Sequence, residues 1–164
     1  MAKSNNWTKE ETIIAFNVYC KIPFKSSSKT NPTIIKYANI IGRSPSALNM
    51  KVGNFGRLDP ELKKQGIVGL GNGSKLDEIV WNEFNGNWGK LAYESELLIA
   101  EFQNKKVEEI IDDEVFEFPF GTERETIIKQ RVNQNFFRST ILSSYNLKCC
   151  ITGLSISEFL VASH

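Results

Sequence analysis

The sequence is poor in histidine and cysteine and contains no long hydrophobic segment. Its 164 residues include one histidine and three cysteines. No apolar run approaches the roughly 18–20 residues that are needed to cross a bilayer. The N-terminal stretch MAKSNNWTKEE also lacks the apolar core of a secretory signal. We therefore expect a cytoplasmic protein with no membrane partner.

The odd number of cysteines argues against a disulfide framework. Cys20 stands alone, whereas Cys149 and Cys150 are adjacent. A closed zinc site needs four ligands, and two adjacent cysteines with one distant histidine do not make a tetrahedral set. Zinc is therefore disfavoured, and Cys150 is expected to be a small buried hydrophobic residue.

The net charge of +1 hides three segments of different character. Residues 1–65 have eleven lysines and arginines against four acidic residues, which is a net +7. Residues 66–118 have four against twelve, a net −8, and residues 119–164 have five against three, a net +2. This asymmetry predicts a basic domain that binds a polyanion, an acidic connector and a separate C-terminal domain. Ordinary solvated surface charge is the alternative.

Hydrophobic periodicity and capping residues predict a mainly α-helical chain. Thr8 and Glu11 form a capping-box pattern at the start of a first helix. The second helix is capped by Asn31 or Thr33 and ends at Gly42. Ser44, followed by Pro45, begins a third helix with a core stripe. The residues of this stripe are Leu48, Val52 and Phe55.

The three predicted helices of residues 1–65 have the spacing of a helix-turn-helix unit. Together with Trp7, the unit resembles the Myb/SANT-like tryptophan-led trihelical family, in which the third helix enters the major groove of DNA. The resemblance implies base or phosphate contacts from the exposed face and flanks of that helix. A packing unit that binds protein is the alternative. The candidate DNA-binding residues are Arg43, Ser46, Asn49, Lys51 and Arg57.

Residues 66–118 are expected to form an acidic helical connector. The glycine-rich stretch GIVGLGNGS at its start lacks the Lys-Ser/Thr pair and the preceding strand of a phosphate loop. We therefore interpret it as an ordered connection. Ser74, with Asp77 three residues later, then predicts a capped helix, and a longer helix is expected from Trp88 to Lys105.

Residues 119–164 are expected to contain a long helix followed by two strands. The helix begins at Thr122 and stops near Asn146, and the segments CCITG and FLVAS would form a hairpin. This segment resembles the start of the HNH endonuclease domain of bacterial restriction-type proteins, whose core is a ββα-metal fold. The matching residues are Arg131, Gln134, Phe137, Arg138, Leu142, Tyr145, Cys150, Thr152, Gly153, Leu160, Ala162 and His164.

The resemblance implies metal-dependent hydrolysis of a DNA phosphodiester. His164 corresponds to the general base on the first strand of the family's fold, and a neutral imidazole suits that role near pH 7. A divalent cation, expected to be Mg²⁺, is held in the family by residues that follow this histidine. Ser163 stands where many relatives have an aspartate ligand. We therefore expect an incomplete ββα hairpin that holds no metal and does not cleave DNA alone.

The resemblance also bears on the partners of the chain. Arg131 and Arg138 could contact DNA phosphates or form ion pairs on the helix. Double-stranded DNA is the expected partner, and a homodimer is considered as well. A DNA-binding regulator without enzymatic activity and a protein-interaction module are the competing function classes. They differ from a nuclease in not depending on His164.

Overall fold

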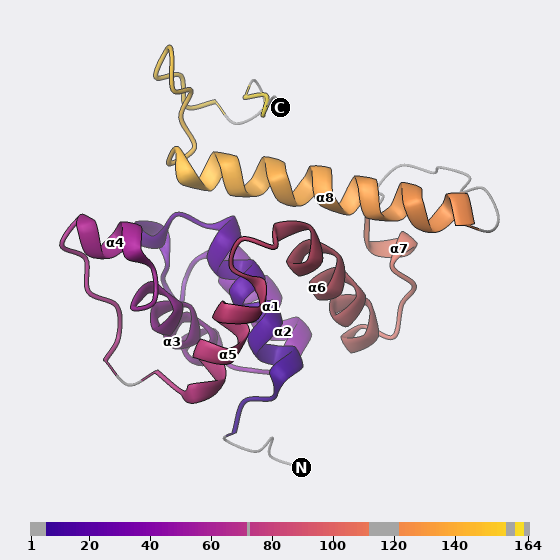
Figure 1. Ribbon diagram of the computed structural model, residues 1–164, viewed down its shortest axis with the longest axis horizontal. Helices are drawn as coiled ribbons and strands as arrows, with labels where there is room; N and C mark the ends of the chain where they lie inside the picture. Colours follow the sequence, from indigo (N-terminus) through magenta and orange to yellow (C-terminus); the bar gives the residue numbers. More distant parts are fainter. Residues whose placement is uncertain (1–5, 72, 112–121, 157–159, 163–164) are drawn as a thin grey trace.

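The computed structural model describes residues 6–71, 73–111, 122–156 and 160–162, and it is mainly α-helical, as predicted. The described residues contain no β-strand. Figure 1 shows the helices α1 to α6 gathered into one body with α8 lying across it. The elements are α1 (Lys9–Lys21), the 3-10 helix η1 (Phe24–Ser26), α2 (Pro32–Ile41), α3 (Pro45–Gly56), α4 (Pro60–Lys64), α5 (Lys75–Phe84), α6 (Trp88–Phe102), α7 (Glu108–Ile111) and α8 (Thr122–Ser144).

The predicted helix starts agree with the structure because local hydrogen bonds satisfy the helix ends, whereas the helix predicted from Trp88 to Lys105 ends at Phe102. The Thr8 side chain accepts a hydrogen bond from the backbone N–H of Glu11, and the Glu11 side chain accepts one from the Thr8 N–H. Asn31, rather than Thr33, caps α2. Gly42 ends α2 with a φ of +67°, a conformation that glycine adopts without strain.

Helix α1 is the central element of the fold. It packs against α2, α3, α5, α6 and α8, and residues 11–18 are all buried. Glu11, Thr12 and the amide nitrogen of Asn17 form hydrogen bonds inside the protein, whereas the side-chain oxygen of Asn17 has no partner among the described residues. The amide nitrogen of Asn17 donates to the Ser95 hydroxyl at 2.5 Å, and that hydroxyl lies 2.6 Å from the Leu91 carbonyl. Residues 11–18 mix polar and apolar side chains, so their complete burial is not apparent from the sequence.

Helix α8 shares the core of the other helices. Ile128, Val132 and Phe136 are buried against α1 and α6, as their helical spacing predicts. The same spacing predicts Tyr145 on this face, but Tyr145 is about half exposed at 51%. The contacts of α8 are with α1, α6 and α7, and Tyr145 follows the last residue of the helix, Ser144.

One hydrophobic cluster contains residues from all three of the segments predicted from charge, 1–65, 66–118 and 119–164. Phe16 and Phe55 come from the first segment, Phe84 and Leu91 from the second, and Val132 from the third. Their side chains are buried together. The segments therefore differ in charge while they contribute to a shared core.

The predicted strand CCITG is a turn. The Cys149 N–H donates to the Leu154 carbonyl at 2.8 Å, and the Gly153 N–H donates to the Cys149 carbonyl at 2.9 Å. Gly153 has a φ of +72°, which favours glycine. Cys150 is exposed rather than buried, because this turn directs it away from the core. Of the predicted strand FLVAS, only residues 160–162 are described, and they are not helical.

None of the helices in the described ranges is both long enough and apolar enough to cross a membrane.

Candidate functional site

The predicted DNA-reading face of α3 is exposed only near the N-terminus of the helix. Ser46 is exposed and Met50 is 59% exposed. Asn49 is half-buried, and its side-chain oxygen accepts a hydrogen bond from the Ser27 hydroxyl at 2.6 Å. This bond joins α3 to the loop between α1 and α2. The Asn49 carbonyl group is thus already engaged within the protein.

The glycine-rich connector covers the other half of this face. The Leu70 N–H donates to the Gly53 carbonyl at 3.3 Å, and a Cβ on Gly53 would lie 2.9 Å from the Leu70 side chain. Arg57 pairs with Glu78 at 2.9 Å and lies directly against Gly73. The close packing of Leu70 and Arg57 explains why glycine occupies positions 53 and 73. The connector therefore leaves little of this end of α3 open to a ligand.

Arg43 and Lys51 lie inside the protein in ion pairs. Arg43 pairs with Glu11 at 2.7 Å, and Lys51 pairs with Asp77 at 2.6 Å. The Arg43 and Lys51 side chains are only 9% and 4% exposed. Both cations also lie over the ring of Trp7, at 5.1 and 4.9 Å from its centroid. Neither side chain has open surface for a phosphate, so we leave both out of the proposed DNA interface.

Ion pairs connect the basic N-terminal third to the acidic middle. Besides the pair of Lys51 with Asp77, three cations of the first segment bind carboxylates of the second. These pairs are Lys9–Glu83, Lys21–Glu96 and Arg57–Glu78. The charge asymmetry in the sequence is therefore partly neutralised by tertiary contacts. The exposed lysines of residues 6–65 with no ion pair in the described structure are Lys25, Lys29, Lys36 and Lys63.

A hydrogen bond connects two of the residues on which the HNH resemblance rests, Arg138 and Leu160. Arg138, on α8, donates a hydrogen bond to the Leu160 carbonyl. Leu160 is also buried, with 7% of its surface exposed. The segment that leads to His164 is therefore fixed to α8 at Leu160. Arg131 is half-buried on the same helix.

The turn after α8 holds a thiol whose pKa is lowered, that of Cys149. Hydrogen bonds from Thr152, together with the backbone N–H of Ile151, hold the pKa of the Cys149 thiol below its ordinary value. In contrast, burial raises the pKa of Cys20, on α1, to about 12. Cys149 is therefore the more nucleophilic of these two thiols near neutral pH.

The predicted catalytic residue, His164, and its neighbour Ser163 lie outside the described residues. Within the described ranges, no group of three or more His, Cys, Asp or Glu side chains could hold a metal ion.

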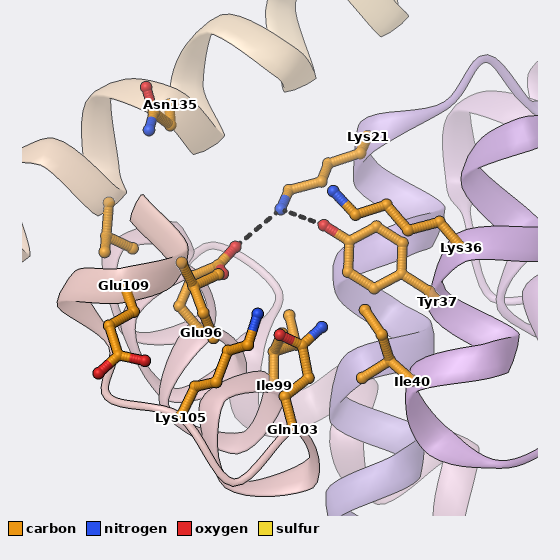
Figure 2. A pocket seen from close by; sticks show the side chains of 12 residues that line it. Lys21, Lys36, Tyr37, Ile40, Glu96, Ile99, Gln103, Lys105, Glu109 and Asn135 are labelled. Carbon is orange, nitrogen blue, oxygen red and sulfur yellow. Dashed lines mark hydrogen bonds and ion pairs between the residues drawn. The ribbon is translucent and has the colours of Figure 1, made fainter. Parts of the chain in front are cut away.

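A charged cluster that was not predicted lies between α1, α2 and α6. The Lys21 ammonium group donates to the Tyr37 hydroxyl at 3.1 Å and to Glu96 at 3.0 Å (Figure 2). Burial by itself would lower the pKa of Lys21, but Tyr37 and Glu96 raise it on balance above its ordinary value. Lys21 and Glu96 are 75 positions apart, so no local pattern could have predicted this cluster.

The fold and this geometry define a mainly helical protein with a shared core. In comparisons with known proteins, no protein-family model, no curated protein and no solved structure matches the chain.

Proposed function

We propose that this chain is part of a metal-dependent DNA endonuclease of the HNH type. The observation that carries the proposal is the contact between Arg138 and Leu160. These two residues belong to separate halves of the motif, the long helix and the segment that ends at His164. A functional resemblance requires both halves to meet in space, and this hydrogen bond brings them together. The turn at residues 149–154 reverses the chain between them.

In this proposal, the chain supplies the general base and its support. His164 accepts a proton from the water that attacks the phosphodiester, since a neutral imidazole can do so near pH 7. Arg138 acts as a positioning residue because its guanidinium group holds the Leu160 carbonyl, four positions before His164. The cation supplies charge stabilisation when bound, and its ligands are expected among residues that follow His164 in the family's motif.

The proposed duplex contacts are fewer than the sequence suggests. Lys25, in η1, and Lys29 are exposed on the connection between α1 and α2, whose Ser27 donates a hydrogen bond to Asn49 of α3. Together with Ser46, they form the proposed phosphate-contacting surface, which we call the α3 loop surface. Its contacts are expected to orient the duplex and not to read its sequence.

The test is a cleavage assay on the protein as its gene encodes it, with duplex DNA and Mg²⁺. Replacing the base, as in His164→Ala, is expected to lower the cleavage rate by at least about 100-fold, because general base catalysis contributes factors of this size. Val161→Ala is the matched control because Val161 is 85% exposed in the same segment, and its cleavage rate should be unchanged. Undiminished cleavage by His164→Ala would contradict the proposal.

A second variant tests whether Arg138 positions the Leu160 carbonyl or contacts a DNA phosphate. Arg138→Met is expected to slow cleavage while the affinity for duplex DNA is retained. If Arg138 contacted a phosphate instead, the variant would bind DNA more weakly, and the slope of log affinity against log salt would become shallower by about one. DNA binding without cleavage by the unaltered protein under every divalent cation would favour a regulator over a nuclease.

A further inference from the structure

A cavity of about 380 Å³ lies where α1, α2, α6 and α8 meet, next to α7. This volume is in the range of pockets that hold small organic molecules. Figure 2 shows side chains from the N-terminal helices on one side and from α6 and α7 on the other. The cavity lies away from the α3 loop surface and from the turn that follows α8, because none of their residues lines it.

The fixed charge in this cavity is the ammonium group of Lys21. Its side chain is only 13% exposed and is held by the Tyr37 hydroxyl and the Glu96 carboxylate. An ammonium group has three N–H donors, and the described residues provide partners for two of them. The third donor is therefore available to a ligand. Tyr37 and Glu96 also raise the pKa of Lys21, so the group stays cationic at neutral pH.

Two more lysines line the same cavity. Lys36 comes from α2 and lies over the Tyr37 ring, 5.8 Å from its centroid. Lys105 follows α6 and reaches in from the opposite wall (Figure 2). Neither has an ion pair within the described ranges. Three ammonium groups on three different parts of the chain thus line one small space.

The remaining lining limits what kind of anion can bind. Glu96 is paired with Lys21, and Glu109 is exposed on α7, so the lining has three cations and two carboxylates. A molecule with several anionic groups would meet repulsion from these carboxylates. The amides of Gln103 and Asn135 can hydrogen-bond hydroxyl groups, and aliphatic side chains complete the wall. These aliphatic residues are Ile40, Ile99, Ile110 and Val132.

We propose that this cavity binds a small phosphomonoester with a hydroxyl-bearing organic body. The three terminal oxygens of a phosphate match the three lysine ammonium groups, and lysine is a common point-charge ligand of phosphate. A carboxylate has only two oxygens and would leave one lysine unused. The organic body lies on the aliphatic wall and hydrogen-bonds Gln103 and Asn135. The site is independent of the proposed nuclease activity.

Calorimetric titration of the full chain with adenosine 5′-monophosphate and with inorganic phosphate tests this site, and adenosine serves as the probe without phosphate. We expect saturable binding of adenosine 5′-monophosphate and at least about tenfold weaker binding of adenosine. Lys36→Gln and Lys105→Gln each remove one charge-assisted hydrogen bond, so each should weaken adenosine 5′-monophosphate about tenfold. Both lysines lie at the rim, so these variants are expected to fold. Lys63→Gln, an exposed lysine outside the cavity, should bind normally.

Three results would overturn the proposal. The first is no saturable binding of either phosphate-bearing probe. The second is equal affinity for adenosine and adenosine 5′-monophosphate, which would mean that the phosphate is not recognised. The third is an equal loss of affinity in Lys63→Gln and in the two cavity variants, which would indicate nonspecific attraction. Loss of affinity in Lys36→Gln and Lys105→Gln alone supports it, whether or not the full-length protein cleaves DNA.

Discussion

The role of Lys51 in the structure differs from the role that the sequence predicts for it. As a lysine on the flank of a predicted recognition helix, it suits a phosphate contact. In the structure, its ammonium group lies 2.6 Å from Asp77 and over the ring of Trp7. Asp77 also accepts a hydrogen bond from the Ser74 N–H at the start of α5. The ion pair of Lys51 with Asp77 therefore stabilises the packing of α5 against α3.

We predict that Lys51→Met lowers the free energy of unfolding by about 3 kcal/mol, because removal of one partner leaves the buried Asp77 carboxylate uncompensated. Chemical denaturation followed by far-ultraviolet circular dichroism measures this. Lys63→Met, at an exposed lysine, should stay within about 0.5 kcal/mol of the unaltered protein. Equal effects of the two variants would show that the buried pair has no special role.

At the scale of elements, the packing of α1 and α8 differs most from what their sequences suggest. Helix α1 has polar residues along its sequence but is surrounded by five other helices. Helix α8 contains residues on which the nuclease prediction rests, yet its Ile128, Val132 and Phe136 pack in the same core as α1 and α6. The segment that the sequence separates as a C-terminal domain is thus held by the body of the protein.

We predict that Phe136→Ala destabilises residues far from α8. Phe136 is 4% exposed, and truncation of a buried phenylalanine costs about 3–5 kcal/mol. Trp88 lines the same pocket as Phe136, so the measurement uses a Trp88→Phe background, in which the fluorescence of Trp7 and Trp81 reports on the body outside α8. Its unfolding midpoint should shift to lower denaturant together with that of circular dichroism.

The matched control for this prediction is Tyr145→Ala, an exposed aromatic residue just after the same helix. It should leave both midpoints nearly unchanged. If Phe136→Ala shifted only the circular dichroism signal, α8 would unfold independently, and the shared core would not be cooperative.

At the scale of the whole molecule, charge is distributed differently from what the sequence suggests. The N-terminal third has a net charge of +7 and the middle a net charge of −8. Four ion pairs connect these two segments. Four of the eleven cations of the N-terminal third are therefore paired with carboxylates of the middle segment, and the proposed DNA contact uses only Lys25 and Lys29 among the exposed lysines without ion pairs.

We predict that paired and unpaired lysines differ in their effect on DNA binding. Lys25→Gln with Lys29→Gln should make the slope of log affinity against log salt shallower by about two, since each phosphate contact contributes roughly 0.9. Lys9→Gln with Lys64→Gln removes the same formal charge from lysines that are ion-paired, and the slope should change little. Fluorescence anisotropy with a labelled duplex at several salt concentrations measures both. Equal changes would mean that only net charge matters.

Much of the secondary structure could be predicted because its causes are local. Three local features depend only on residues a few positions apart. They are the capping boxes at Thr8 and Ser74, the left-handed backbone conformation of Gly42, and the buried stripe of Leu48, Val52 and Phe55. The strand predicted at residues 149–153 was wrong, because β-branched composition cannot reveal the hydrogen bonds that close a turn there. The nuclease role of His164 and DNA contact by Ser46 and Arg131 stay predictions.

Helix type, helix boundaries and the overall charge pattern follow from the order of residues, since capping, periodicity and turn conformation act over distances of a few positions. Which charged residues are buried, and with which partners they pair, was decided by tertiary packing alone. Lys21 meets Glu96 and Lys51 meets Asp77 only because distant helices come together around α1. Desolvation then makes such pairing necessary, because an unpaired charge in the core is costly.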